Sequence, residues 1–254
     1  MKPQKLIAGL LGLALAPATS QAQVFLNDNF DSYADQAAFQ AAWAPNATTA
    51  TLSTEQAVSL SQSVKGLTTA SRNARNLGEI GFLNGSTDII TFRFDFYDSN
   101  GAAATYRQYA ELDDGSAPGS AGQLFAMGLN NNIASSYYMA RILGFDGGAG
   151  ASAFFKLDGV GAPTRATGWH TLEAQISDTA VNYYVDGILS KSLDTTALTD
   201  RSLDTVKIGS NLSSAQVAYY DNVYVARVAV PEPSAAAFLG LGLSGLIALR
   251  RMRK

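Results

Sequence analysis

Hydrophobic and polar residues alternate along much of the chain between residues 24 and 228, in short segments that turn signals separate. In the clearest segment, residues 89–97, Ile90, Phe92, Phe94 and Phe96 fall on one face and polar residues on the other. A period of two is typical of a β-strand, because successive side chains point to opposite faces. The same pattern predicts further strands at residues 106–112, 123–129, 136–143, 151–157, 169–176, 181–186, 205–208 and 216–228.

Aspartate or asparagine stands close before glycine in the intervals between these segments. Such pairs supply the positive φ angles that tight hairpin turns need. They occur at residues 98–101, 113–115, 146–148, 158–159 and 186–187.

One short helix is expected, within residues 32–43. Ser32 and Asp35 have the spacing of a capping box, and Phe39 and Trp43, four residues apart, share one face that can pack on a sheet.

Many short strands without alternating helices predict an all-β fold, an antiparallel two-sheet jelly-roll sandwich over residues 23–229. The chain of 254 residues is long enough for one sizeable core.

The first 22 residues have the features of a secretory signal peptide. Lys2 and Lys5 precede an apolar run at residues 6–16, and Ser20-Gln21-Ala22 provides the small-x-small cleavage site, so cleavage is expected after Ala22. The apolar run spans only about 16 Å as a helix, too short for a bilayer core of about 30 Å. A buried N-terminal helix is the alternative, and Pro17 disfavours it.

The last 25 residues have three parts in a fixed order. A Val-Pro-Glu-Pro-Ser motif at residues 230–234 is followed by an uncharged apolar stretch at residues 235–249 and a basic tail at residues 250–254. The stretch predicts a short transmembrane helix, and the positive-inside rule keeps the tail cytoplasmic, so that residues 23–229 face outward.

This C-terminal arrangement resembles the PEP-CTERM sorting signal of Gram-negative bacteria. In that family a membrane-embedded exosortase recognises the motif, and the exported proteins accompany exopolysaccharide production. The resemblance implies that Pro231, Glu232, Pro233 and Ser234 form the sorting motif and that Arg250-Arg251 closes the membrane segment. These residues are those of a substrate and are not catalytic. The alternative is a simple C-terminal anchor.

Two segments of the central region resemble concanavalin A-like, laminin-G-like domains. They are Gly168-Trp169-His170-Thr171-Leu172 with the hairpin Tyr184-Val185-Asp186-Gly187, and the ending Tyr220-Asp221-Asn222-Val223-Tyr224-Val225. The resemblance implies the same two-sheet sandwich. Lectins, calcium-binding modules and laminarinase-type glycosidases share that fold, so the function must be argued from residues.

Charge and cysteine content exclude several classes. Six of the 18 basic and one of the 21 acidic residues lie outside residues 23–230, which leaves that part with a charge of −8. An acidic surface repels phosphate backbones, so we expect no nucleic-acid partner. The absence of cysteine excludes thiolate nucleophiles, iron–sulfur clusters and thiolate zinc sites.

A glycosidase active site is only half present. The laminarinase-type motif Glu-x-Asp-x-x-Glu finds its nearest match at residues 111–116, where Glu111 and Asp113 are present and Ser116 replaces the second glutamate. A retaining mechanism needs both acids. Glu111 and Asp113 are therefore expected to be exposed residues at a strand end, and no catalytic residue is assigned.

The remaining candidates have weaker support. His170 is the only histidine, so a metal site with two histidines is excluded, and we expect a packed or hydrogen-bonded strand residue. Calcium is a possible ligand and no other cofactor is expected; its candidate ligands are aspartates at turns, which also have a plain turn-forming role: Asp113, Asp114, Asp146, Asp158 and Asp186. One tyrosine of each adjacent pair at 137–138, 183–184 and 219–220 should face outward, where it could stack on a sugar.

Together these features predict an exported, exosortase-sorted, non-catalytic protein of the cell envelope, cell surface or extracellular matrix. Its expected partners are the exosortase and extracellular polysaccharide, with the membrane as a contact of the C-terminal helix before processing. The alternatives are a divergent laminarinase-type glycoside hydrolase and a calcium-holding adhesion module.

Overall fold

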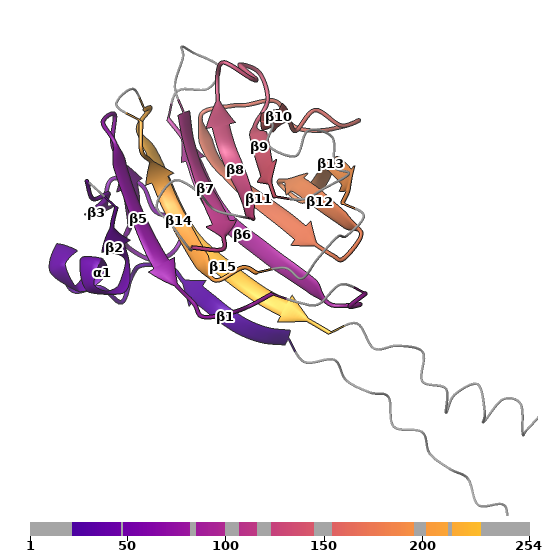
Figure 1. Ribbon diagram of the computed structural model, residues 1–254. Coiled ribbons are helices and arrows are strands. Elements are labelled where there is room, and N and C mark those ends of the chain that lie inside the picture. Colours follow the sequence, from indigo (N-terminus) through magenta and orange to yellow (C-terminus); the bar gives the residue numbers. More distant parts are fainter. Residues whose placement is uncertain are drawn as a thin grey trace, which may run out of the picture. The chain divides into compact units, whose positions relative to one another are not determined.

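Two antiparallel sheets dominate the computed structural model, which describes residues 22–46, 48–81, 85–99, 107–115, 123–144, 154–195, 202–212 and 215–229 (Figure 1). Sheet A contains β1 (Ala22–Asp28), β3 (Thr51–Ser53), β4 (Ser63–Gly66), β6 (Ile89–Asp98), β11 (Gly168–Ile176), β12 (Ala180–Val185), β13 (Ile188–Asp194) and β15 (Ala218–Val228). Sheet B contains β2 (Ala44–Pro45), β5 (Ser71–Asn76), β7 (Arg107–Asp113), β8 (Leu124–Asn130), β9 (Met139–Leu143), β10 (Phe154–Lys156) and β14 (Thr205–Ser210).

In both sheets, some strands that are neighbours in the sheet are far apart in the sequence. Sheet A runs β13-β12-β11-β6-β15-β4-β3, with β1 also paired to β15, and sheet B runs β10-β9-β8-β7-β14-β5-β2. The first and last described strands are therefore partners, with Ala22 opposite Val228. The all-β class, the two antiparallel sheets and the one helix are as predicted.

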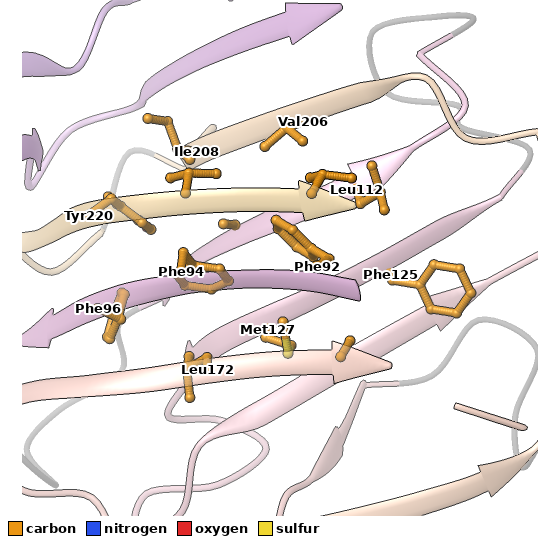
Figure 2. Close-up of a cluster of buried hydrophobic side chains, with 14 of the residues drawn as sticks. Phe92, Phe94, Phe96, Leu112, Phe125, Met127, Leu172, Val206, Ile208 and Tyr220 are labelled. Carbon is orange, nitrogen blue, oxygen red and sulfur yellow. The ribbon is translucent and has the colours of Figure 1, made fainter. Parts of the chain in front are cut away.

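The core lies between the sheets, and the alternation seen in the sequence builds it. Phe92, Phe94 and Phe96 project from β6 toward sheet B, where they meet side chains of β7, β8 and β14 (Figure 2). Tyr220 of β15 packs among them, with its ring centre 5.5 Å from that of Phe96. Burying aromatic side chains of this size is the main favourable contribution to the stability of such a sandwich.

The predicted strands are confirmed, with shifts of a few residues at their ends. β9 begins at Met139 rather than at residue 136. The strand predicted at residues 151–157 is β10, and residues 151–153 lie outside the described residues. The strands β2, β3, β4, β5 and β13 and the N-terminal strand β1 were not predicted. The hairpin turn at Asp186-Gly187 is confirmed, with φ angles of 51° and 76°.

The predicted helix is α1 (Gln36–Ala42), shorter than expected. Asp35 is its N-cap and accepts a hydrogen bond from the backbone N–H of Ala38 at 2.8 Å. The capping box with Ser32 is therefore wrong, because the helix begins four residues after that serine. Phe39 and Trp43 are both buried, as predicted.

Both predicted targeting segments lie almost entirely outside the described residues. Only Ala22 of the signal peptide is described; it is exposed and opens β1. Pro231, Glu232, Pro233, Ser234, Arg250 and Arg251 are outside, as is the apolar stretch at residues 235–249. Within the described ranges, none of the helical structure has the length and apolarity of a membrane span.

Candidate functional site

The side of sheet B that faces away from the core carries an unusual number of charges. One row of paired residues crosses six strands on this side: Ala74, Lys207, Glu111, Ala126, Arg141 and Phe154. Because paired residues in antiparallel strands share a face, the sheet itself brings these side chains together. We use the name "charged face" for this surface, which consists of the residues Arg72, Arg107, Tyr109, Glu111, Asp113, Arg141, Phe154 and Lys207.

Two ion pairs occupy the centre of the charged face. Arg72 of β5 pairs with Glu111 of β7, and Lys207 of β14 pairs with Asp113 of β7. Lys207 Nζ also lies 4.0 Å from Glu111 Oε1. The four side chains are at most 7% exposed, so the charges are held largely without water and depend on each other.

Burial shifts the pKa values of these groups. It raises the pKa of Asp113 above its usual value, although the hydrogen bond and charge of Lys207 act in the opposite direction. It lowers the pKa of Arg72, and the nearby positive charge of Arg141 lowers it further against the attraction of Tyr109 and Asp113.

A pair of arginines lies over a single aromatic ring next to this centre. The guanidinium carbons of Arg107 and Arg141 are each 4.9 Å from the centre of the Phe154 ring. The Nε atom of each is buried and has no hydrogen-bond partner. All three side chains are partly exposed, which makes this end of the charged face accessible to solvent.

The charges are distributed unevenly over the face. Asp204 lies near the Asp113 end. Its pKa is raised by burial and by the negative charges of the neighbouring Asp113, Glu79 and Asp114. The opposite end holds Arg107 and Arg141, neither of which forms an ion pair with any residue in the described ranges. The face is therefore acidic at one end and basic at the other.

Tyr109 lies between the two ends and faces a glycine. Gly128 of β8 stands opposite it, and a Cβ at that glycine would come within 2.5 Å of the Tyr109 Cα. The guanidinium of Arg72 is 6.0 Å from the centre of the Tyr109 ring. Only 7% of Tyr109 is exposed, so it supports Arg72 rather than offering a surface for sugar stacking.

The expectation that Glu111 and Asp113 are exposed strand-end residues is wrong. They are 3% and 0% exposed, because Arg72 and Lys207 come from the adjoining part of the sheet and pair with them. Residue 116, where a glycosidase would have its second acid, lies outside the described residues. Gly115 has φ of 58° and donates its N–H to Asp113, as expected of a turn.

His170 is a hydrogen-bonded strand residue, as predicted. Its Nδ1 lies 2.8 Å from Asp186 Oδ2 and its Nε2 3.1 Å from the carbonyl of Ala166. Its ring centre is 5.1 Å from that of Tyr138. It is on sheet A, away from the charged face.

Those predicted calcium ligands that the structure describes do not form a cluster. In the described part of the chain, no group of three or more His, Cys, Asp or Glu side chains could hold a metal ion. Asp113, Asp158 and Asp186 are engaged with Lys207, Lys191 and His170 respectively, whereas Asp146 is outside the described residues.

The expectation for the tyrosine pairs is met at two of three sites. Tyr138 and Tyr183 are buried while Tyr137 and Tyr184 are partly exposed. Tyr219 is only 6% exposed and its hydroxyl donates to Glu55 at 2.5 Å, so this ring is not free for a sugar.

Arg72, Arg107, Arg141 and Lys207 were not anticipated as site residues. A signal was present at Arg141 and Lys207, since each interrupts a strand in which its neighbours are apolar or small, as in Val206-Lys207-Ile208. A buried cation in such a strand needs a partner, and Glu111 and Asp113 are the acids placed in the same way.

Comparison with known proteins supports the fold alone. No protein-family profile matches the chain, and no curated protein matches it. Three solved structures resemble it: the binding domain of Paraclostridial Mosquitocidal Protein 1 (TM-score 0.55, 11% identity, 82% of this chain and 49% of the other); the carbohydrate esterase of Shiga toxin-encoding bacteriophage phi24B (0.52, 14%, 81% and 99%); and cellulose-induced protein Cip1 (0.48, 14%, 79% and 96%). The chain spans about half the length of the first.

Proposed function

We propose that this chain is an exported, non-catalytic protein of the bacterial cell surface or extracellular matrix that binds exopolysaccharide through the charged face of sheet B. The observation that carries the proposal is this face, where polar and charged side chains from β5, β7, β9 and β14 converge on one side of a sheet whose other side is core. We further propose the concanavalin A-like jelly-roll connectivity for the sandwich. A toxin binding domain and a carbohydrate esterase are among the chains of similar fold, so the fold is compatible with binding and with catalysis.

The binding test uses the whole chain and a panel of soluble polysaccharides. Retention in affinity electrophoresis or a calorimetric signal with at least one polymer, without release of reducing sugar, supports the proposal. A variant that disrupts the centre of the face, Glu111→Gln, should weaken retention, whereas Glu173→Gln on sheet A should not. Absence of binding to every polymer refutes it.

The export route is tested at the C-terminus. The tripartite sequence at residues 230–254 supports cleavage by an exosortase. Mass spectrometry of the protein from cells with and without that enzyme should find a shortened C-terminus only in the first case. An intact Lys254 in both would reduce the segment to an ordinary anchor.

A glycoside hydrolase is the second candidate, and one observation favours it. Glu111 and Asp113 share the charged face, and burial raises the pKa of Asp113 as a proton donor requires. Against it, each carboxylate is held by a cation, Arg72 or Lys207, which stabilises the ionised form. Release of sugar from a polysaccharide that Glu111→Gln abolishes would establish this function in place of the first.

A further inference from the structure

The arginine pair of the charged face, Arg107 and Arg141 over Phe154, lacks the counter-ions that its surroundings call for. Each guanidinium carbon is 4.9 Å from the same ring centre, so the two positive charges are at most about 10 Å apart, which is comparable to the Debye length in physiological salt. Each Nε–H is buried without an acceptor. No described residue forms a hydrogen bond or ion pair with either guanidinium.

Elsewhere on the charged face, each cation has a counter-ion. Arg72 has Glu111, and Lys207 has Asp113. In another part of the protein, Arg165 is fully buried and has Asp98 at 2.9 Å. A buried donor without an acceptor costs free energy, and two like charges held near each other add to that cost. Arg72 also has a buried Nε without an acceptor, but its charge is paired with Glu111. Among the described residues of the charged face, Arg107 and Arg141 are the cations whose charge has no counter-ion.

The side chains of both arginines are preorganised for binding a ligand. Contact with the Phe154 ring restricts each guanidinium group, and the strands β7, β9 and β10 fix the positions of the backbones. A guanidinium held in place presents parallel N–H groups that match a carboxylate, and little rotamer entropy is lost when it binds. Lys156 is exposed on the same face of β10, two residues from Phe154, so the positive charge continues along the sheet edge.

We infer that Arg107 and Arg141 form a binding site for the carboxylate groups of an acidic polysaccharide, a polymer of uronic acids. The inference rests on the proposed function, since it names the chemical class of the polysaccharide. A polyuronate carries one carboxylate on each acidic sugar. Each of the two guanidinium groups can donate hydrogen bonds to one such carboxylate at a time.

The rest of the molecule disfavours a more densely charged ligand. Residues 23–230 carry a net charge of −8, and the other end of the same face contains Asp113 with Asp114 and Asp204 nearby. A nucleic acid, with a phosphate at every nucleotide, would be repelled along most of its length. A sugar polymer that places single carboxylates at the basic end meets less repulsion.

The test measures binding of the whole chain to four probes: polygalacturonate, dextran, dextran sulfate and free galacturonate. Polygalacturonate should bind, more weakly as the salt concentration rises, and dextran should not. Arg107→Gln and Arg141→Gln should each weaken polygalacturonate binding by about 10- to 100-fold, the loss expected for hydrogen bonds to a charged group.

Arg93→Gln is the matched control, because Arg93 also stacks on a ring, that of Tyr224 at 5.1 Å, but lies on the outer side of sheet A. Its binding should equal that of the wild type. Arg141→Lys keeps the charge but loses the fork and should give an intermediate affinity. Thermal unfolding of each variant establishes that it is folded. If a glutamine variant is not folded, the comparison of Arg141→Lys with the wild type decides the test.

The outcomes separate this inference from the proposed function. Equal binding by the wild type and both glutamine variants overturns the site, as does binding of dextran sulfate without polygalacturonate. Binding of dextran as tight as that of polygalacturonate overturns the acidic class but leaves a polysaccharide-binding protein. Absence of binding to all polymers refutes both proposals.

Discussion

Arg165 and Asp98 form a two-point ion pair inside the protein, with Arg165 Nε 2.9 Å from Asp98 Oδ2 and an Nη 3.3 Å from Oδ1. Neither side chain is exposed. Arg165 also donates to Asn131 in the turn after β8, and Gln216 donates to Asp98 at 2.7 Å. One guanidinium thus joins the segment after β10 to the end of β6 and to the turn between β8 and β9.

Removing Arg165 takes the guanidinium away from the buried charge of Asp98. We expect Arg165→Ala to lower the free energy of unfolding by about 3–5 kcal/mol. Urea denaturation followed by tryptophan fluorescence measures the change. Lys191→Ala is the control, because Lys191 and Asp158 form an exposed pair at 3.5 Å, and its loss should cost at most about 1 kcal/mol. Equal effects of the two substitutions would contradict the prediction.

Gly209 in β14 is a position where only glycine fits. Its φ is 93°, and a Cβ there would lie 2.1 Å from the carbonyl oxygen of Ser71 in the neighbouring strand. Gly209→Ala should therefore force β5 and β14 apart and lower the melting temperature by roughly 10 °C or more. Gly78 provides the control, because its φ is 74° and nothing lies near the position of its Cβ.

Gly78→Ala should cost only the strain of a left-handed backbone, about 1–2 kcal/mol. The difference between the two alanine variants isolates the close approach of the strands. Similar melting temperatures for both would show that β5 can move without cost.

Tyr33 makes the free energy of unfolding depend on pH in the alkaline range. Burial, together with the hydrogen bond that its hydroxyl donates to Asp28 at 2.6 Å, raises its pKa to about 12. In the unfolded chain the phenol ionises near pH 10. The contribution of the neutral phenol is therefore complete below pH 10 and is lost as the pH rises through about 12.

Tyr33→Phe should flatten this dependence by up to one proton. Denaturant midpoints measured from pH 9 to pH 11.5 give the slope for each protein, since the slope equals the difference in bound protons. A Tyr33→Phe variant with an unchanged slope would place the titration elsewhere.

Asp221 holds the segment that follows β3. Its Oδ2 accepts hydrogen bonds from the backbone N–H groups of Val58 and Ser59 at 2.9 and 3.0 Å, and the Ser59 hydroxyl donates to both of its oxygens. Leu60, next to them, is 93% exposed. Asp221→Ala should therefore release this segment and increase its cleavage by chymotrypsin at least about tenfold.

Asp88→Ala is the control for that experiment, because Asp88 makes a partly exposed contact with Arg227 at 3.6 Å. It should leave the cleavage rate unchanged. Cleavage of Asp221→Ala at the wild-type rate would mean that side-chain packing alone fixes the segment.

The strands that could be predicted are those with one apolar and one polar face. β6 is the clearest, since its phenylalanines all belong to the core. β5 could not be recognised, because its residues Ser71-Arg72-Asn73-Ala74-Arg75-Asn76 are polar on both faces. On one face Arg72 meets Glu111, and on the other Arg75 donates to Asp28 at 2.6 Å. Only the folded sheet supplies these partners.

The charged face was hidden for the same reason. Glu111 and Asp113 were recognised as candidate acids, but nothing near them in the sequence indicates that cations from β5 and β14 lie beside them. The pairing of β14 with both β5 and β7 decides this, and such long-range register is not encoded in local periodicity. Local patterns gave the fold class, whereas the electrostatics of the site came from pairing between distant strands.

The pairing of the first and last strands determines how the protein responds to mechanical force. β15 is not an edge strand: it is hydrogen-bonded to β6 along most of its length and to β1 and β4 on its other side (Figure 1). A pull on the chain beyond residue 229 therefore loads two rows of backbone hydrogen bonds along the strand axis, where they must yield together rather than one by one. A domain anchored at that end would resist unfolding by the shear force of flowing water.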